Sequence, residues 1–291
     1  MSQGHPIQRL RFGHGLRWLP AAAEVLSRQP SAFAGIAGIW LLISMLAVLF
    51  PVIGQLMLVI FTPLITAGLL IANDRVGQGL RPHPLTLFAA WKEPVTRLRL
   101  VLIGLFSLGG ALAAAMVLVT WISAQLNPEA LESLQALSDA EPEVQLEALV
   151  DALAGTSPGL GLVMAGLVFG LVLAAMYFAI PLIAFGRWSL WPSLAYSVKA
   201  AVINWRAMIG FFLAAIALLG GLFLIVMVLV SVFTLALGTF GAMLAQVLML
   251  ILAMAVQLLM AGAQYQAFCE IFGWSPGPEE PPPGPDSAVD L

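Results

Sequence analysis

The chain has 291 residues, of which 61% are hydrophobic and only 9% are charged, whereas soluble domains carry about 25% charged residues. This composition excludes a soluble globular fold, because a domain of this size has no interior large enough for so much apolar surface. The net charge of −3 excludes little as a total, and the single cysteine, Cys269, excludes an intramolecular disulfide.

Residues 1–30 form a basic segment, which we expect to be cytoplasmic. It holds Arg9, Arg11, Arg17 and Arg28. We expect it to carry a helix that lies on the membrane surface and begins near Pro20, because proline is favoured in the first turn of a helix. The apolar run that follows lacks a convincing signal-peptide cleavage site, so we expect it to be retained as a membrane span.

The next part of the chain, 31–272, is predicted to be an all-α transmembrane domain with six spans. The spans are expected at about 31–50, 52–72, 100–122, 159–184, 207–233 and 240–268. Each is long enough to cross a hydrocarbon core of ~30 Å at ~1.5 Å per residue. The last two depend on a turn within a stretch that has no charged residue, and Gly238, Thr239 and Gly241 are the best candidates for it.

The distribution of basic residues supports an even number of spans. All twelve Lys and Arg residues fall in 1–30, 73–99 and 187–206, whereas 127–158 has none and holds seven acidic residues. With six spans, the three basic segments share one side of the membrane, which the positive-inside rule assigns to the cytoplasm. A five-span or seven-span arrangement would separate them, so we predict that both termini are cytoplasmic.

Each basic segment contains a proline and leads into a span, which predicts a threefold repeat. Pro20, Pro84 and Pro192 begin similar stretches, so we expect three units, each a surface helix followed by a transmembrane helical hairpin. The tryptophans of these segments are expected to lie at headgroup level; they are Trp18, Trp91, Trp188, Trp191 and Trp205. Contacts with anionic lipid are predicted for Arg28, Lys92, Arg97, Arg99, Lys199 and Arg206.

Two segments are expected to lie outside the membrane domain. Residues 127–158 predict an acidic periplasmic insertion of two short amphipathic helices, because leucines recur there at helical spacing. Residues 273–291 predict a disordered cytoplasmic tail rich in proline.

Reactive groups are sparse in the predicted spans. None contains an Asp, Glu, Lys, Arg or His in its interior, and Glu270 at the inner end of the last span is the nearest exception. The three histidines, His5, His14 and His83, fall in predicted cytoplasmic segments far apart in the sequence. We therefore predict no metal site, no haem or other cofactor, and no catalytic residues.

Mild polarity remains inside the spans. Gln246, Gln257 and Gln264 are spaced to share one face of the last span, and Gln55 lies in the second. Two interpretations are open: these amides join helices by hydrogen bonds, or they line a polar path for a solute. Glycine pairs are expected to permit close helix approach; they are Gly35 and Gly38, Gly109 and Gly110, Gly166 and Gly170, and Gly220 and Gly221.

The chain resembles an uncharacterised family of proteobacterial inner-membrane proteins. The features that carry the resemblance are the basic N-terminal segment, the six spans, Pro181-Leu182-Ile183 at a helix end, and the stretch from Trp191-Pro192 to Asn204-Trp205. That family is similar to the membrane domain attached to some glycerophosphoryl diester phosphodiesterases. The resemblance covers about residues 15–272 without the acidic insertion, and it implies a bacterial inner membrane but no catalytic residue.

These observations favour a non-enzymatic accessory or scaffold protein in envelope or lipid physiology. The expected partners are membrane lipids, and in addition another membrane protein or a second copy of the chain, but not nucleic acid. The alternative is a transporter or permease for a neutral or amphipathic solute that uses the glutamine face. A lipid-modifying enzyme would require a site on the cytoplasmic loops that the sequence does not reveal.

Overall fold

A computed structural model describes residues 7–126, 157 and 159–276, and every regular element in these ranges is a helix. The long helices are α2 (Pro30–Val48), α3 (Pro51–Gly77), α4 (Pro94–Ser123), α7 (Gly159–Ala184) and α9 (Trp205–Phe272). The shorter ones are α1 (Phe12–Arg28), the 3-10 helix η1 (Pro84–Trp91) and α8 (Leu190–Ile203). The predicted acidic insertion and most of the predicted tail lie outside the described residues.

The five long helices are each long and apolar enough to cross a membrane. In the most apolar stretch of α9 only 6% of the residues are buried within the protein, and Leu224 and Leu235 are 66% and 87% exposed. So large an exposed apolar surface is unfavourable in water and favourable in hydrocarbon. The predicted class, an all-α membrane protein with several spans, is confirmed at this level.

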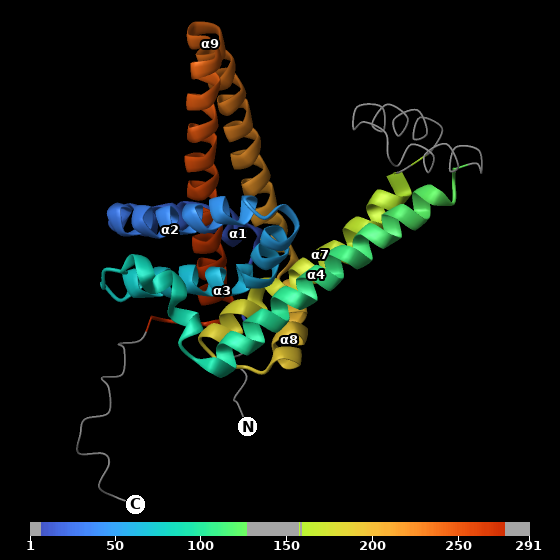
Figure 1. The fold of residues 1–291 in the computed structure, drawn as a ribbon. Helices are drawn as coiled ribbons and strands as arrows, with labels where there is room; N and C mark the ends of the chain where they lie inside the picture. Colours follow the sequence, from blue (N-terminus) through green and yellow to red (C-terminus); the bar gives the residue numbers. More distant parts are fainter. Residues whose placement is uncertain (1–6, 127–156, 158, 277–291) are drawn as a thin grey trace, which may run out of the picture.

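Helix α9 is broken at Gly238, as the glycines of the charge-free stretch predicted. Gly238 has φ 58° and ψ −135°, a combination that side chains beyond glycine rarely adopt. The chain then folds back so closely that a Cβ on Gly241 would lie 1.8 Å from the carbonyl oxygen of Phe233. Figure 1 shows the two halves of α9 side by side, and it also shows α4 beside α7.

Prolines begin three of the long helices, but Pro20 does not begin α1. Pro30, Pro51 and Pro94 occupy the first turns of α2, α3 and α4, where the missing N–H is not needed. Helix α1 already begins at Phe12, so Pro20 lies inside it and the prediction for its start was wrong. Pro20 lies on the exposed side of α1, where the backbone groups that it frees remain away from the core.

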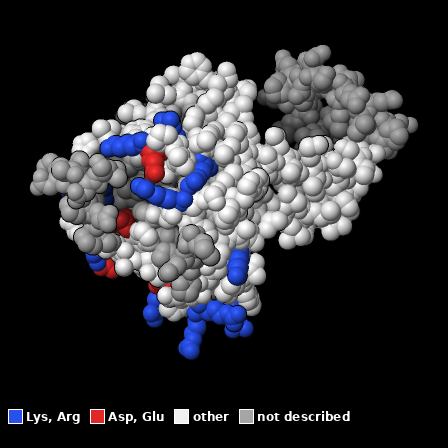
Figure 2. Space-filling model, turned by 90° about the horizontal axis from the view of Figure 1, so that it is seen from below, with Lys and Arg blue, Asp and Glu red and all other residues white. Residues whose placement is uncertain are grey.

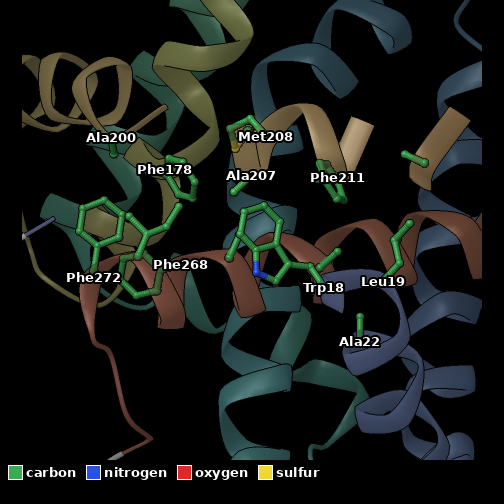
Figure 3. Close-up of a cluster of buried hydrophobic side chains, with 14 of the residues drawn as sticks. Trp18, Leu19, Ala22, Phe178, Ala200, Ala207, Met208, Phe211, Phe268 and Phe272 are labelled. Carbon is green, nitrogen blue, oxygen red and sulfur yellow. The ribbon is translucent and has the colours of Figure 1, made fainter. Parts of the chain in front are cut away.

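The core lies where the short helices pack against one end of the long helices, a region that we call the junction. One cluster joins α1, the end of α7, α8 and both ends of α9, around the fully buried Trp18 and Phe178 together with Phe268 and Phe272 (Figure 3). Two neighbouring clusters join α3 to η1, α4 and α7, and α2 to α3 and α9. The junction therefore brings segments from the whole described chain together.

Close backbone contacts at the junction depend on glycines other than the predicted pairs. A Cβ on Gly15 would lie 1.8 Å from the carbonyl oxygen of Ala207, and one on Gly68 would lie 2.0 Å from that of Leu87. By contrast, a Cβ would meet nothing within 4 Å at most members of the predicted pairs, namely Gly38, Gly109, Gly166, Gly170, Gly220 and Gly221. For these six glycines the prediction was wrong, because sequence spacing does not reveal which side of a helix faces a neighbour.

Basic side chains gather at the junction. Figure 2 shows Lys and Arg over the lower face of the molecule, next to a few acidic residues. The tryptophans of the basic segments differ in their roles: Trp191 and Trp205 are 71% and 54% exposed, as expected of anchors, but Trp18 is fully buried. The anchor prediction is therefore wrong for Trp18, whose indole is part of the core.

Candidate functional site

Two of the four predicted glutamines meet in a cavity between α2, α3, α7 and α9. Gln257 and Gln264 line a space of about 390 Å³ together with Thr62 and Thr66 from α3. Gln246 and Gln55 are exposed and do not line this cavity. Only half of the predicted polar set is therefore brought together, since Gln246 lies in the part of α9 before Gln257, which extends away from the cavity, and Gln55 lies near the start of α3.

The two cavity glutamines also link helices. Gln257 accepts a hydrogen bond from the indole N–H of Trp40 on α2, and Gln264 donates one to the backbone carbonyl of Tyr177 on α7. The Tyr177 hydroxyl is buried and has no hydrogen-bond partner among the described residues. Both interpretations of the glutamines thus find support, because they join helices and also line a space with an unused polar group.

A larger and almost wholly apolar groove of about 610 Å³ lies between α1, α2 and the second half of α9. Its only polar side chain is Ser27; the rest of the lining is Ala23, Leu26, Pro30, Phe33, Ala34, Ala37, Gly38, Leu41, Ile251, Met254, Ala255, Leu258 and Leu259. The volume lies within the usual range of ligand sites. Such a lining favours a hydrocarbon chain and offers no group that would recognise a polar molecule.

A buried carboxylate that sequence reasoning missed lies at the end of α3. Asp74 is only 8% exposed. Its Oδ1 accepts hydrogen bonds from the Tyr265 hydroxyl at 2.6 Å and from the Trp274 indole at 3.1 Å, and its Oδ2 accepts one from Gln78 at 2.8 Å. These three neutral donors satisfy the carboxylate. The sequence did contain a sign that Asp74 is buried, because Asp74 directly continues the apolar run of α3, one helical turn beyond Leu70.

Next to Asp74 is a third cavity, of about 280 Å³, which we call the Asn73 cavity. Its lining is Ala21, Glu24, Val25, Arg28, Asn73, Gly77, Tyr265, Gln266, Cys269, Trp274 and Pro276. Asn73 is 1% exposed, and it donates to the carbonyl of Leu69. Its side-chain oxygen has no hydrogen-bond partner in the part of the chain that the structure describes.

Glu270 fixes α1 against the end of α9. Its Oε2 accepts a hydrogen bond from the Trp18 indole and contacts His14 Nδ1, both at 3.0 Å. A backbone bond from Gln8 to Ile271 and one from Leu10 to the Asn204 side chain complete this contact. Glu270, which lies near the C-terminal end of α9, therefore has a structural role.

The six residues predicted to contact anionic lipid differ in their availability. Lys92 and Arg97 are exposed at the end of η1 and the start of α4, whereas Arg99 donates to the backbone carbonyls of Arg187 and Trp188 at 2.6 and 3.0 Å. Arg28 forms an ion pair with Glu24 at 2.8 Å. Lys199 lies over the ring of Tyr196 and Arg206 over that of Trp205.

Within the described ranges, no group of three or more His, Cys, Asp or Glu residues is placed to hold a metal ion.

No protein-family model matches the chain, and no curated protein or solved structure matches it. The resemblance to the inner-membrane family therefore stays a prediction, and any function must be argued from the cavities.

Proposed function

We propose that the protein is a six-span helical protein of a bacterial inner membrane that binds membrane lipids in a non-enzymatic, accessory role in envelope or lipid physiology. The six spans would form three hairpins with both termini in the cytoplasm. The break at Gly238 supports this count, because it divides the longest charge-free stretch into two helices. The gathering of basic side chains on one face supports the orientation.

Cysteine labelling tests this topology. In a Cys269→Ala background, single cysteines replace Ser157, Ser189 and Thr239, and intact cells are treated with a membrane-impermeant thiol reagent. Six spans predict labelling of Ser157→Cys and Thr239→Cys from outside, and of Ser189→Cys only after permeabilisation. If α9 crossed the membrane as one span, position 239 would be protected on both sides.

The observation that carries the lipid-binding proposal is the apolar groove. It has the volume of a ligand site, and a single hydroxyl, that of Ser27, is the only polar side-chain group along it. An acyl chain gains no hydrophobic free energy on moving from the bilayer into this groove, because both are apolar, so van der Waals packing against the lining holds it there. A membrane lipid can therefore hold one acyl chain in this groove while its headgroup remains near the basic face.

Two glycine substitutions provide a matched test. Gly38 lines the groove, and a Cβ there meets nothing within 4 Å, so Gly38→Leu places a side chain in the groove without a clash. Gly166→Leu is the control, since Gly166 is equally open but lies on α7 away from the groove. Native mass spectrometry of the purified protein should show less bound lipid for Gly38→Leu than for the control. Equal lipid content in both variants would reject the groove as the lipid site.

A permease for a neutral or amphipathic solute is the second candidate, and the cavity around Gln257 and Gln264 favours it. The cavity combines two amides, two threonines and the unused Tyr177 hydroxyl, which suits a ligand with several hydrogen-bonding groups. A transport path must be reachable from each side of the membrane in turn. Thr66→Cys in the Cys269→Ala background should then react with impermeant thiol reagents from both sides in proteoliposomes, whereas protection from both sides would reject the path.

A further inference from the structure

The Asn73 cavity differs from the groove in its chemistry, and it lies on another face of α1. Ala21, Glu24 and Arg28 line the cavity, whereas Ala23 and Ser27 line the groove. At 100° per residue the centres of these two sets lie about 110° apart around the helix. The last turns of α1 therefore separate the two spaces, and a ligand in one does not need the other.

The residues that line the cavity include one with a buried acceptor that has no donor. Asn73 Oδ1 is buried and unpartnered within the described residues, and a Cβ on Gly262 would lie 3.3 Å from it. Leaving such an oxygen without a hydrogen bond is costly, so native structures normally provide it with a partner. A ligand that enters the cavity is expected to donate an N–H or O–H to this oxygen.

The surroundings of this oxygen favour a positive charge on the donor. The adjacent residue, Asp74, holds its carboxylate with three neutral donors, so these contacts leave its negative charge without a counter-ion. Two of those donors, Tyr265 and Trp274, line the cavity with their aromatic side chains, and such rings also attract cations. An anion next to this oxygen would be repelled.

An exposed part of the lining can bind an anion instead. The Arg28 side chain is 56% exposed, and its ion pair with Glu24 joins one guanidinium nitrogen to one carboxylate oxygen. A guanidinium has five N–H donors and binds phosphate readily. The lining therefore combines a buried acceptor beside a carboxylate with an exposed arginine beside a glutamate.

We propose that the Asn73 cavity binds a phosphoethanolamine group, with the primary ammonium on Asn73 Oδ1 and the phosphate at Arg28. The ammonium supplies the missing donor and balances the charge of Asp74. A quaternary ammonium has no N–H for Asn73, and a glycerol headgroup has no positive charge. A metal ion would require several free oxygen ligands, whereas the Asp74 oxygens already accept hydrogen bonds.

Phosphatidylethanolamine and soluble O-phosphoethanolamine carry the same group, and the experiment separates them. The full-length protein in detergent is mixed with phosphatidylethanolamine, phosphatidylcholine or phosphatidylglycerol, and binding is measured by native mass spectrometry. Competition with O-phosphoethanolamine is measured in parallel. The wild type should prefer phosphatidylethanolamine, and Asn73→Leu should bind it about tenfold more weakly, as expected for the loss of one hydrogen bond to a charged group.

Ala21→Phe and Ala23→Phe keep the test valid if Asn73→Leu fails to fold. Both lie on α1, but phenylalanine at position 21 fills the Asn73 cavity and at position 23 fills the groove. Loss of the headgroup preference in Ala21→Phe alone supports the proposal, even if the groove proves to bind no acyl chain. Competition by O-phosphoethanolamine would indicate that the headgroup alone suffices, and its failure would indicate that the lipid is required. Equal binding of the three lipids by the wild type, without any binding of O-phosphoethanolamine, would overturn the proposal.

Discussion

The contact between α1 and the start of α9 should be intolerant of a single methyl group at Gly15. Gly15 is buried, and a Cβ there would lie 1.8 Å from the carbonyl oxygen of Ala207 and 2.7 Å from the backbone nitrogen of Phe211. Both neighbours are backbone atoms, so no side chain can rotate away. Gly15→Ala must therefore move the two helices apart.

The size of the effect follows from these distances. Ordinary contacts of a Cβ begin at 3.4 Å, so the helices must separate by about 1.6 Å, the difference between 3.4 and 1.8 Å. Overpacking of this kind costs about 1–3 kcal/mol, and alanine recovers up to ~1 kcal/mol through its higher helix propensity. Because the clash involves backbone on both sides, we take the upper end of this cost, which leaves a net loss of about 2 kcal/mol after the gain in helix propensity.

Gly13→Ala provides the control for this prediction. Gly13 lies in the same helix and is exposed, and a Cβ there would meet nothing within 4 Å, so the same substitution should be neutral or slightly stabilising. Thermal unfolding in detergent, followed by tryptophan fluorescence, should show a lower Tm for Gly15→Ala and a red shift of the emission as the buried Trp18 becomes exposed. Equal Tm values for the two variants would refute the proposed packing of α1 on α9.

Two further predictions concern the junction and the α9 turn. Glu270→Leu removes the acceptor of the buried Trp18 indole and should destabilise the protein by about 1–3 kcal/mol, whereas Glu270→Gln keeps an oxygen acceptor and should unfold near the wild-type Tm. Equal Tm values for these two variants would show that the indole does not need Glu270. Gly238→Ala imposes a side chain at φ 58° and should cost about 1–3 kcal/mol, measured by thermal unfolding against Gly221→Ala in the same helix. A Gly238→Ala variant as stable as this control would contradict a tight turn at Gly238.

The sequence allowed the apolar helices to be predicted because length and composition are local properties. The predicted spans 52–72 and 159–184 match α3 and α7 closely at their apolar ends. The turn at Gly238 was also predictable, because glycine is the residue that such backbone angles require. Helices α3 and α4 extend beyond the predicted spans, since their polar ends are stabilised by packing at the junction.

The polar sites were less predictable because they depend on residues far apart in the sequence. Asp74 is buried by Tyr265 and Trp274, which lie 191 and 200 positions further along the chain. The spacing of Gln246 and Gln257 suggested a shared face, but it could not show where the neighbouring helices end. A face becomes a cavity only where other helices cover it, so tertiary contacts decide which of several equivalent amides line a cavity.

The difference between local composition and tertiary contacts also explains why the three spaces described above lie at or near the junction. The parts of the long helices that lie far from the junction expose apolar side chains such as Leu235 and offer few polar groups. These parts therefore contact hydrocarbon without recognising a particular molecule. At the junction, short helices cross the ends of the long ones, and such crossings leave spaces lined by side chains of several helices. Buried polar groups such as Asn73 are costly there unless a partner is bound. An unpaired group that persists in a tightly packed region is therefore a stronger indication of ligand binding than the larger apolar surface around it.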